Sequence, residues 1–95
     1  MQNDQYSWHT YIVQCNDGTL YTGIAKNMAK RLAAHNSGGN GAKYTRSRRP
    51  VRLVYQEVFH SRSEAAKREY QLKKMDPAEK RKLICKMGLK LKGQP

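Results

Sequence analysis

One carboxylate stands where an apolar side chain is expected. The spacing of residues 62–74 predicts a helix, and Glu69 falls inside its apolar stripe. That stripe consists of Ala65, Ala66, Tyr70 and Leu72. A carboxylate in such a stripe must be paired or metal-bound unless the stripe reaches solvent. A salt bridge to one of the nineteen Lys and Arg residues would therefore explain Glu69 structurally. The functional alternative is a hard-cation ligand, because one carboxylate with several waters suits Mg²⁺.

A second pair of chemically versatile residues, Arg31 and His35, is four residues apart. Both lie in a segment predicted to be helical, residues 28–37, so their side chains share one face. Such a face is often simply solvated. However, a guanidinium is the preferred partner of phosphate oxygens, and an imidazole titrates near neutral pH.

Two tyrosines occupy strand-like runs, residues 9–15 and 19–24, which an Asn-Asp-Gly tripeptide separates. This pattern predicts a β-hairpin. Because strand side chains alternate between faces, a two-residue loop would place Tyr11 and Tyr21 on opposite faces. A three-residue loop that closes on Gly18 with a positive φ would place them on one face, as a core or cross-strand pair or as part of a site. We expect the three-residue loop.

A basic segment follows the glycine-rich residues 38–41. Four cations and one tyrosine lie within residues 43–49. A charge run is often a solvated face, but cations beside an aromatic ring also suit contact with phosphates and bases. The nucleic-acid-binding residues that we predict here are Lys43, Tyr44, Arg46, Arg48 and Arg49.

Length and charge narrow the class of protein. The 95 residues fit one domain, and nineteen Lys and Arg against seven Asp and Glu give a net charge of +12. A polyanion is therefore the first partner to expect, and the oligomeric state stays open. No apolar run approaches the ~20 residues that cross a bilayer, so we expect no membrane partner and a cytoplasmic location. Cys15 and Cys85 have no metal-ligand spacing, and we expect both to be reduced packing residues without a disulfide partner.

The remaining elements complete a small α+β domain. Residues 51–59 alternate as a third strand, with Val51, Leu53 and Tyr55 on one side. The helix over residues 28–37 has a predicted apolar stripe of Met28, Ala29, Leu32 and Ala33. Capping boxes open helices over residues 62–74 and 77–86. The order ββαβαα predicts helices against a three-stranded antiparallel sheet in residues 8–86, with a short extension (1–7) and a basic flexible tail (87–95).

Four short blocks in order resemble the GIY-YIG nuclease superfamily. They are His9-Thr10-Tyr11, Tyr21-Thr22-Gly23, Lys30-Arg31-Leu32 with His35, and Arg68-Glu69-Tyr70. The resemblance covers residues 8–84, and residues 41–46 and 70–74 are similar to the small bacterial branch in which the nuclease domain stands alone. Three departures are His9 in place of the motif glycine, Ile24 in place of the lysine of the excision-repair branch, and no asparagine after the glutamate helix.

The resemblance implies metal-dependent hydrolysis of phosphodiester bonds by a three-stranded antiparallel sheet flanked by helices. It makes Tyr11 and Tyr21 the motif tyrosines, Arg31 the catalytic arginine and Glu69 the single ligand of Mg²⁺ or Mn²⁺. It gives His35 a position filled by His or Tyr in the superfamily. Gly23 is the motif glycine, whose missing side chain would let a phosphate or a neighbouring strand approach.

The function expected from this resemblance is an endonuclease or a structure-selective repair or processing nuclease, with DNA favoured over RNA. Either tyrosine could serve as the base that acts on water, and we favour Tyr11 with Tyr21 as the positioning group. The alternative from another class is a nucleic-acid-binding module that keeps the fold without cleaving. A third and weaker interpretation, a ribosome- or RNA-associated basic protein, would leave Glu69 unexplained.

Overall fold

A computed structural model describes residues 7–37 and 43–86, with the side chains of the second range from Thr45 onward. The strands are β1 (Trp8–Gln14), β2 (Leu20–Ala25) and β3 (Arg52–Phe59). The helices are α1 (Met28–Ser37), α2 (Lys43–Arg46), α3 (Arg62–Lys74) and α4 (Pro77–Lys86). Most of the predicted N-terminal extension, the glycine-rich start of the basic segment and the predicted tail lie outside the described residues.

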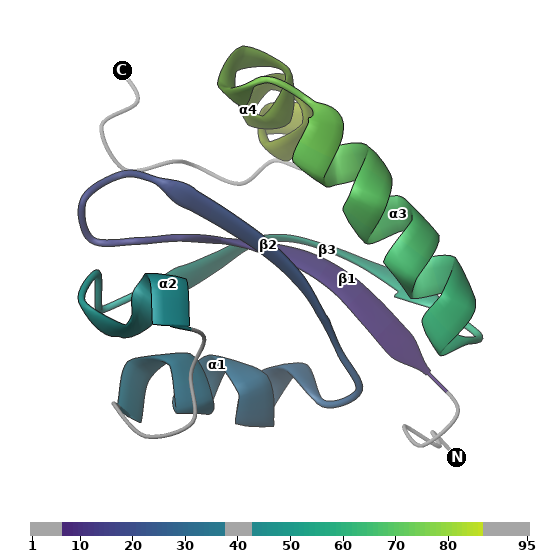
Figure 1. Cartoon of the computed structure of the whole chain (residues 1–95), viewed down its shortest axis with the longest axis horizontal. Helices are drawn as coiled ribbons and strands as arrows, with labels where there is room; N and C mark the ends of the chain where they lie inside the picture. The colour runs from purple at the N-terminus through teal and green to yellow at the C-terminus, as the bar shows by residue number, and fades with distance from the viewer. Residues whose placement is uncertain (1–6, 38–42, 87–95) are drawn as a thin grey trace.

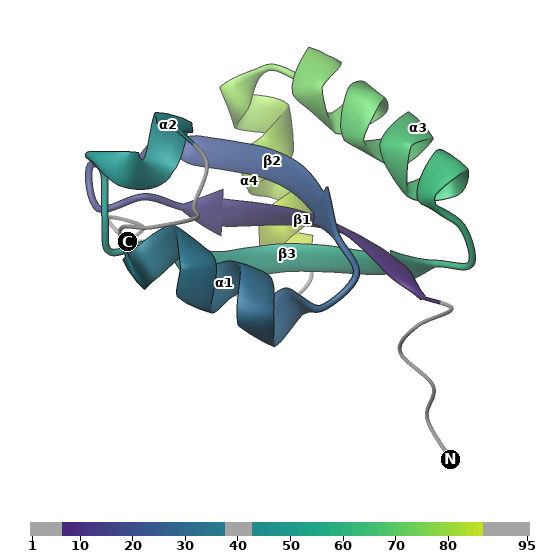
Figure 2. The ribbon, with the colours of Figure 1, turned by 60° about the horizontal axis from the view of Figure 1, so that its bottom comes forward.

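The strands form one antiparallel sheet in the order β2-β1-β3. Figures 1 and 2 show α1 and α2 on one face of this sheet and α3 and α4 on the other. The predicted fold class is confirmed, as are the bounds of α1, α3 and α4, while each predicted strand differs from the observed one by a residue at one or both ends. No described helix has the length and apolar character that a membrane crossing needs.

The hairpin between β1 and β2 has the predicted three-residue loop. The Cys15 amide donates to the Thr19 carbonyl at 2.8 Å, and the Gly18 amide donates to the Cys15 carbonyl at 2.9 Å. Gly18 has a φ of 88°, a conformation that favours glycine. Val13 therefore pairs with Tyr21, and both motif tyrosines lie on the α1 face of the sheet.

A bulge in β3 overturns the alternation that we predicted for this strand. Ile12 pairs with Tyr55 and Val13 pairs with Leu53, so Val54 is an extra residue between them. Leu53 and Tyr55 consequently point to opposite faces of the sheet instead of one. The bulge supplies apolar side chains to both faces from a single short strand.

The α3–α4 face is closed by an apolar core. Its buried members are Ile12, Val54, Tyr55, Leu72 and Ile84. The predicted place of Tyr70 in this stripe is wrong, because its side chain is 63% exposed. Two residues of an α-helix span about 200°, so a residue two positions before the buried Leu72 points away from the sheet.

The α1 face corrects a second predicted stripe. Met28 and Leu32 pack against the sheet as expected, but Ala29 and Ala33 are exposed. The fully buried side chain of α1 is His35, seven residues after Met28 and therefore on the same side of the helix. His35 can be buried on this face although it is polar, because both of its ring nitrogens have hydrogen-bond partners, as described below.

The two cysteines differ from each other. Both are free thiols, but only Cys15 is buried, where it packs with Val13 and Val51. Cys85 is exposed on α4, so the prediction that it is a packing residue is wrong.

Candidate active site

The site is built around Tyr11, which lies on the central strand β1 and has 0% exposure. Its hydroxyl oxygen is 2.8 Å from His35 Nε2 and accepts a hydrogen bond from Arg31 Nε at 3.2 Å. Arg31 and His35 both come from α1, one turn apart. The helix thus presents a cation and an imidazole to the same hydroxyl.

The partners of Tyr11 determine the state of His35. Arg31 can only donate to the Tyr11 hydroxyl, so we assign His35 Nε2, the other group within hydrogen-bonding distance, as the acceptor of the Tyr11 proton. Nδ1 then bears the ring proton and donates it to Thr45 Oγ1, 2.8 Å away on α2. His35 is 1% exposed, and burial together with the positive charge of Arg31 lowers its pKa, which keeps the imidazole neutral.

Gly23 makes room for Tyr11. It lies directly opposite Tyr11 on the edge strand β2. A Cβ atom at position 23 would be 2.7 Å from the Tyr11 hydroxyl oxygen and 2.9 Å from the ring carbon that bears it. The motif glycine therefore accommodates the tyrosine ring of the neighbouring strand β1, and the approach of a phosphate to Gly23 stays a prediction.

Tyr21 lies beside this cluster and is half-buried. Its ring centroid is 6.4 Å from that of Tyr11 and 5.4 Å from that of His35. The pKa of Arg31 is raised, chiefly by the hydrogen bond to Tyr11 and further by contact with Tyr21. The structure thus brings Tyr11, Tyr21, Arg31 and His35 together, as the sequence predicts.

Burial separates the two tyrosines chemically. The pKa of Tyr11 is raised above its ordinary value, primarily because burial disfavours the phenolate, although Arg31 opposes this shift. Since Tyr11 has no exposed surface, its hydroxyl cannot contact a solvent water in this conformation. Tyr21 keeps exposed surface, which favours it over Tyr11 as the group that meets water.

Glu69 comes from the other face of the sheet, on α3. Its carboxylate forms an ion pair with Lys73 at 3.0 Å, one helical turn later, and its side chain is 23% exposed. Its charge is close enough to contribute to the raised pKa of Tyr11. The five predicted catalytic residues therefore lie around the edge strand β2, four on the α1 face and Glu69 on the α3 face.

The side chains of this site could hold a divalent metal only through one carboxylate together with water ligands. Among the residues that the structure describes, no group of three or more His, Cys, Asp or Glu side chains could hold a metal ion. Glu69 offers one part-exposed carboxylate, which matches Mg²⁺ or Mn²⁺ with water as the remaining ligands and does not match zinc. The ion pair with Lys73 is the competing structural role that the sequence analysis left open.

The predicted nucleic-acid-binding residues divide into two groups. Arg48 Nε forms a salt bridge to Asp17 at 3.0 Å, and the Arg48 carbonyl accepts from the Asn16 amide at 2.9 Å, so Arg48 fastens the segment to the hairpin turn. Arg46 and Arg49 are exposed and line a depression of about 440 Å³ beside Asn36. The side chains of Lys43 and Tyr44 lie outside the described part of the chain.

Thr45 is the residue that sequence reasoning missed. It is 0% exposed, although it lies in a segment predicted to be a basic surface segment that contacts nucleic acid. Its hydroxyl holds His35 Nδ1, which fixes the ring orientation and leaves Nε2 for Tyr11. No periodicity marks a single buried threonine in a four-residue helix, and only the tertiary contact identifies it.

The fold and the residues at the edge of β2 define a single nuclease-type catalytic domain. The chain belongs to the GIY-YIG catalytic domain family, a nuclease family, which matches residues 7–82.

Several relatives support this assignment. The chain is 58% identical to the UPF0213 protein DP2720 of Desulfotalea psychrophila over 83 residues, which cover 87% of this chain and 76% of that protein. It is also 58% identical to the UPF0213 protein SSP2268 of Staphylococcus saprophyticus over 76 residues, which cover 80% of this chain and 92% of that protein.

Two solved structures share the fold. The solution NMR structure of the UPF0213 protein BH0048 from Bacillus halodurans has a TM-score of 0.55 and 38% identity, and the match covers 94% of this chain and 88% of that chain. The solution NMR structure of EF2693 from E. faecalis has a TM-score of 0.57 and 37% identity, with coverage of 94% and 95%.

Proposed function

We propose that this protein is a metal-dependent endonuclease that hydrolyses phosphodiester bonds in DNA, in preference to RNA. The observation that supports it most strongly is the buried cluster of Tyr11, His35 and Thr45, which holds Arg31 beside the half-exposed Tyr21. A merely structural helix face would gain little from burying a tyrosine and a histidine under an arginine. The net charge of +12 adds general attraction to nucleic acid.

Arg31 is proposed to stabilise the charge that develops on the phosphate. A phosphodiester resists hydrolysis because its negative charge repels the nucleophile, and a fixed cation offsets that repulsion. The Tyr11 hydroxyl holds the Nε side of the guanidinium, and the raised pKa of Arg31 keeps it fully charged at every working pH. Preorganisation of this kind avoids rearrangement when the reaction occurs.

Tyr21 is proposed to orient or deprotonate the attacking water, while Tyr11 and His35 act as positioning residues. The burial of Tyr11 and its raised pKa support this division of roles, which reverses our expectation from the sequence.

Glu69 is proposed to hold Mg²⁺ or Mn²⁺. A bound divalent cation would supply Lewis-acid neutralisation of the phosphate and the leaving oxygen. Lys73 must release the carboxylate when a metal binds, and this requires little free energy because the ion pair is largely exposed on the lysine side. Arg46 and Arg49, with Lys43 and Tyr44 of the same segment, are proposed to contact flanking nucleic acid.

The experiment that tests this proposal is incubation of the protein with a panel of labelled DNA and RNA substrates. The panel contains single strands, duplexes, flaps and junctions, each with Mg²⁺, Mn²⁺ or EDTA. The proposal expects product bands with metal and none with EDTA, and faster cleavage of DNA than of RNA. Binding that is unaffected by EDTA, without products on any substrate, would instead identify a non-catalytic nucleic-acid-binding module.

A further inference from the structure

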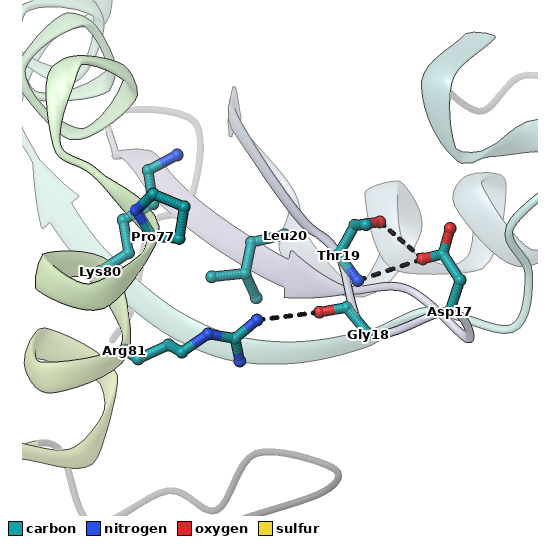
Figure 3. Close-up of a pocket in the computed structure, with 7 residues that line it drawn as sticks. All are labelled: Asp17, Gly18, Thr19, Leu20, Pro77, Lys80 and Arg81. Atoms are coloured by element: carbon teal, nitrogen blue, oxygen red, sulfur yellow. Dashed lines mark hydrogen bonds between the residues drawn. The ribbon is translucent and has the colours of Figure 1, made fainter.

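A pocket with a volume of about 460 Å³ lies between the hairpin turn and α4. One wall consists of residues 17–20 and the other of Pro77, Lys80 and Arg81. Figure 3 shows Arg81 extending from α4 toward Gly18, with Leu20 on the wall formed by the hairpin. None of the predicted catalytic or nucleic-acid-binding residues lines this pocket, so its chemistry is separate from the site described above.

Two cations give the pocket its character. Arg81 is held in place by a hydrogen bond from Nη2 to the Gly18 carbonyl at 3.3 Å. Lys80 is half-buried, and its side chain forms no hydrogen bond or ion pair with any other residue that the structure describes. Its pKa is lowered, first by burial and then by the positive charge of Lys73. A bound anion would relieve both effects, because it would replace the lost hydration and offset the repulsion.

The one carboxylate in the pocket wall, that of Asp17, already has partners for both of its oxygens. Asp17 Oδ1 accepts from the Thr19 amide at 3.1 Å and from the Thr19 hydroxyl at 2.6 Å. Its other oxygen, Oδ2, forms the salt bridge with Arg48. The charge of Asp17 is therefore already compensated on the side of the hairpin that faces the basic segment.

The location of the pocket connects it to the candidate active site. Thr19 and Leu20 directly precede Tyr21 along the chain, and a β-strand rises by about 3.3 Å per residue, so the pocket begins within about 7 Å of Tyr21 along the strand. On the other wall, Lys80 lies close enough to Lys73 for the charge of Lys73 to lower the pKa of Lys80. Lys73 in turn forms the ion pair with Glu69. Tyr21 points to the α1 face and the pocket lies on the α4 side, so an anionic chain that contacts both would pass around the edge strand β2.

From this geometry we infer that the pocket between the hairpin turn and α4 binds a backbone phosphodiester of the DNA substrate, one that flanks the scissile bond, through Lys80 and Arg81. This inference rests on the proposed nuclease function, because it assigns the pocket to the same substrate. The site makes no use of base edges, so its contribution is independent of sequence and depends on salt.

The test measures binding separately from cleavage. A fluorescently labelled single-stranded DNA oligonucleotide is titrated in EDTA at several salt concentrations with the wild type, Lys80→Gln, Lys80→Arg and Lys82→Gln. Lys82 is the matched control, because it is exposed on the same helix and does not line the pocket. Lys80→Gln should weaken binding several-fold and reduce the slope of log K against log salt by roughly one unit. Lys80→Arg should restore both, and Lys82→Gln should change both less.

Three results would contradict this inference or the proposed function on which it rests. If Lys80→Gln binds with the affinity and salt slope of Lys82→Gln, the pocket does not contact the strand and the inference is wrong. If inorganic phosphate shifts the amide NMR signals of Gly18, Leu20 and Lys80 at concentrations as low as the oligonucleotide does, the pocket binds a free phosphorylated molecule and the assigned ligand is wrong. A Lys80 effect on binding without cleavage of any substrate would contradict the proposed nuclease function alone.

Discussion

The two faces of the sheet solve the same burial problem with different chemistry. On the α3–α4 face, aliphatic side chains such as Ile12, Leu72 and Ile84 meet in an apolar core. On the α1 face, the buried layer includes Tyr11, His35 and Thr45, which satisfy one another through hydrogen bonds. A polar buried layer stabilises less than hydrocarbon and requires every partner. The α3–α4 face also buries polar groups, such as Thr10, which donates to the Ala65 carbonyl at 2.7 Å, but the buried polar groups of the α1 face form a connected set that contacts Arg31.

The largest expected effect on stability comes from the apolar face. Leu72→Ala removes a fully buried side chain that packs between α3 and the sheet, so we expect a loss of about 2–5 kcal/mol in the free energy of unfolding. Urea denaturation monitored by circular dichroism measures this loss. Gln71→Ala on the exposed side of the same helix is the control and should change the free energy little. Equal losses in the two variants would contradict the description of this face as the main core.

The next largest effect concerns rate. Arg31→Ala should raise the activation free energy of DNA cleavage by about 3 kcal/mol, roughly a hundredfold in rate, because a preorganised cation is lost. Single-turnover cleavage in Mg²⁺ measures it. Lys30→Ala removes an exposed cation from the same helix and should retain most of the activity. If both variants lose activity equally, Arg31 contributes only general charge.

A methyl group at position 23 tests the contact between the two strands of the site. Gly23→Ala would place Cβ 2.7 Å from the Tyr11 hydroxyl oxygen, and the buried ring cannot move freely, so we expect destabilisation by about 1–3 kcal/mol. In the double variant, Tyr11→Phe removes the nearest atom and should recover part of that loss. Additive losses in this double-mutant cycle would show that the Tyr11 hydroxyl is not the source of strain.

The smallest expected effect is a pH dependence of stability from His35. Its pKa is lowered by burial, so the unfolded chain takes up a proton near pH ~6.5, where the folded chain does not. Stability should therefore fall as the pH drops below that value, by at most about 1.4 kcal/mol per pH unit, until the folded histidine also protonates. Thermal unfolding between neutral and mildly acidic pH measures this slope.

Two histidine variants assign the slope. His60 is exposed, so His60→Gln should keep the slope, whereas His35→Gln should remove it. A slope that disappears with His60→Gln would contradict the buried, neutral state assigned to His35.

The features that could be predicted from the sequence are those that local signals determine. Turn residues and capping residues act locally, so the Asn-Asp-Gly turn and the capping box of Asp76 and Glu79 were sufficient to predict the hairpin and the start of α4. The two bonds of that capping box are present at 3.0 and 2.9 Å. The bounds of the longer helices followed from the same kind of local signal.

What could not be predicted depends on tertiary contacts. The bulge at Val54, the exposure of Ala29 and the burial of Thr45 are decided by partners distant in sequence. A hydrophobic stripe for α1 overlooked His35 because a histidine counts as polar until its partners, Tyr11 and Thr45, are known. The catalytic roles proposed for Tyr21, Arg31 and Glu69 rest on the family resemblance together with this geometry and stay predictions.

The most direct test of the central claim is DNA cleavage by Glu69→Gln. The amide keeps the shape of the side chain but loses the charge that would hold a divalent cation, while fold and DNA binding in EDTA should be retained. Glu64→Gln on the same helix is the matched control, because glutamine can also accept the hydrogen bond that Glu64 takes from the His60 amide. The account predicts metal-dependent cleavage by the wild type and by Glu64→Gln, and none by Glu69→Gln. Metal-dependent cleavage by Glu69→Gln at the wild-type rate would contradict it.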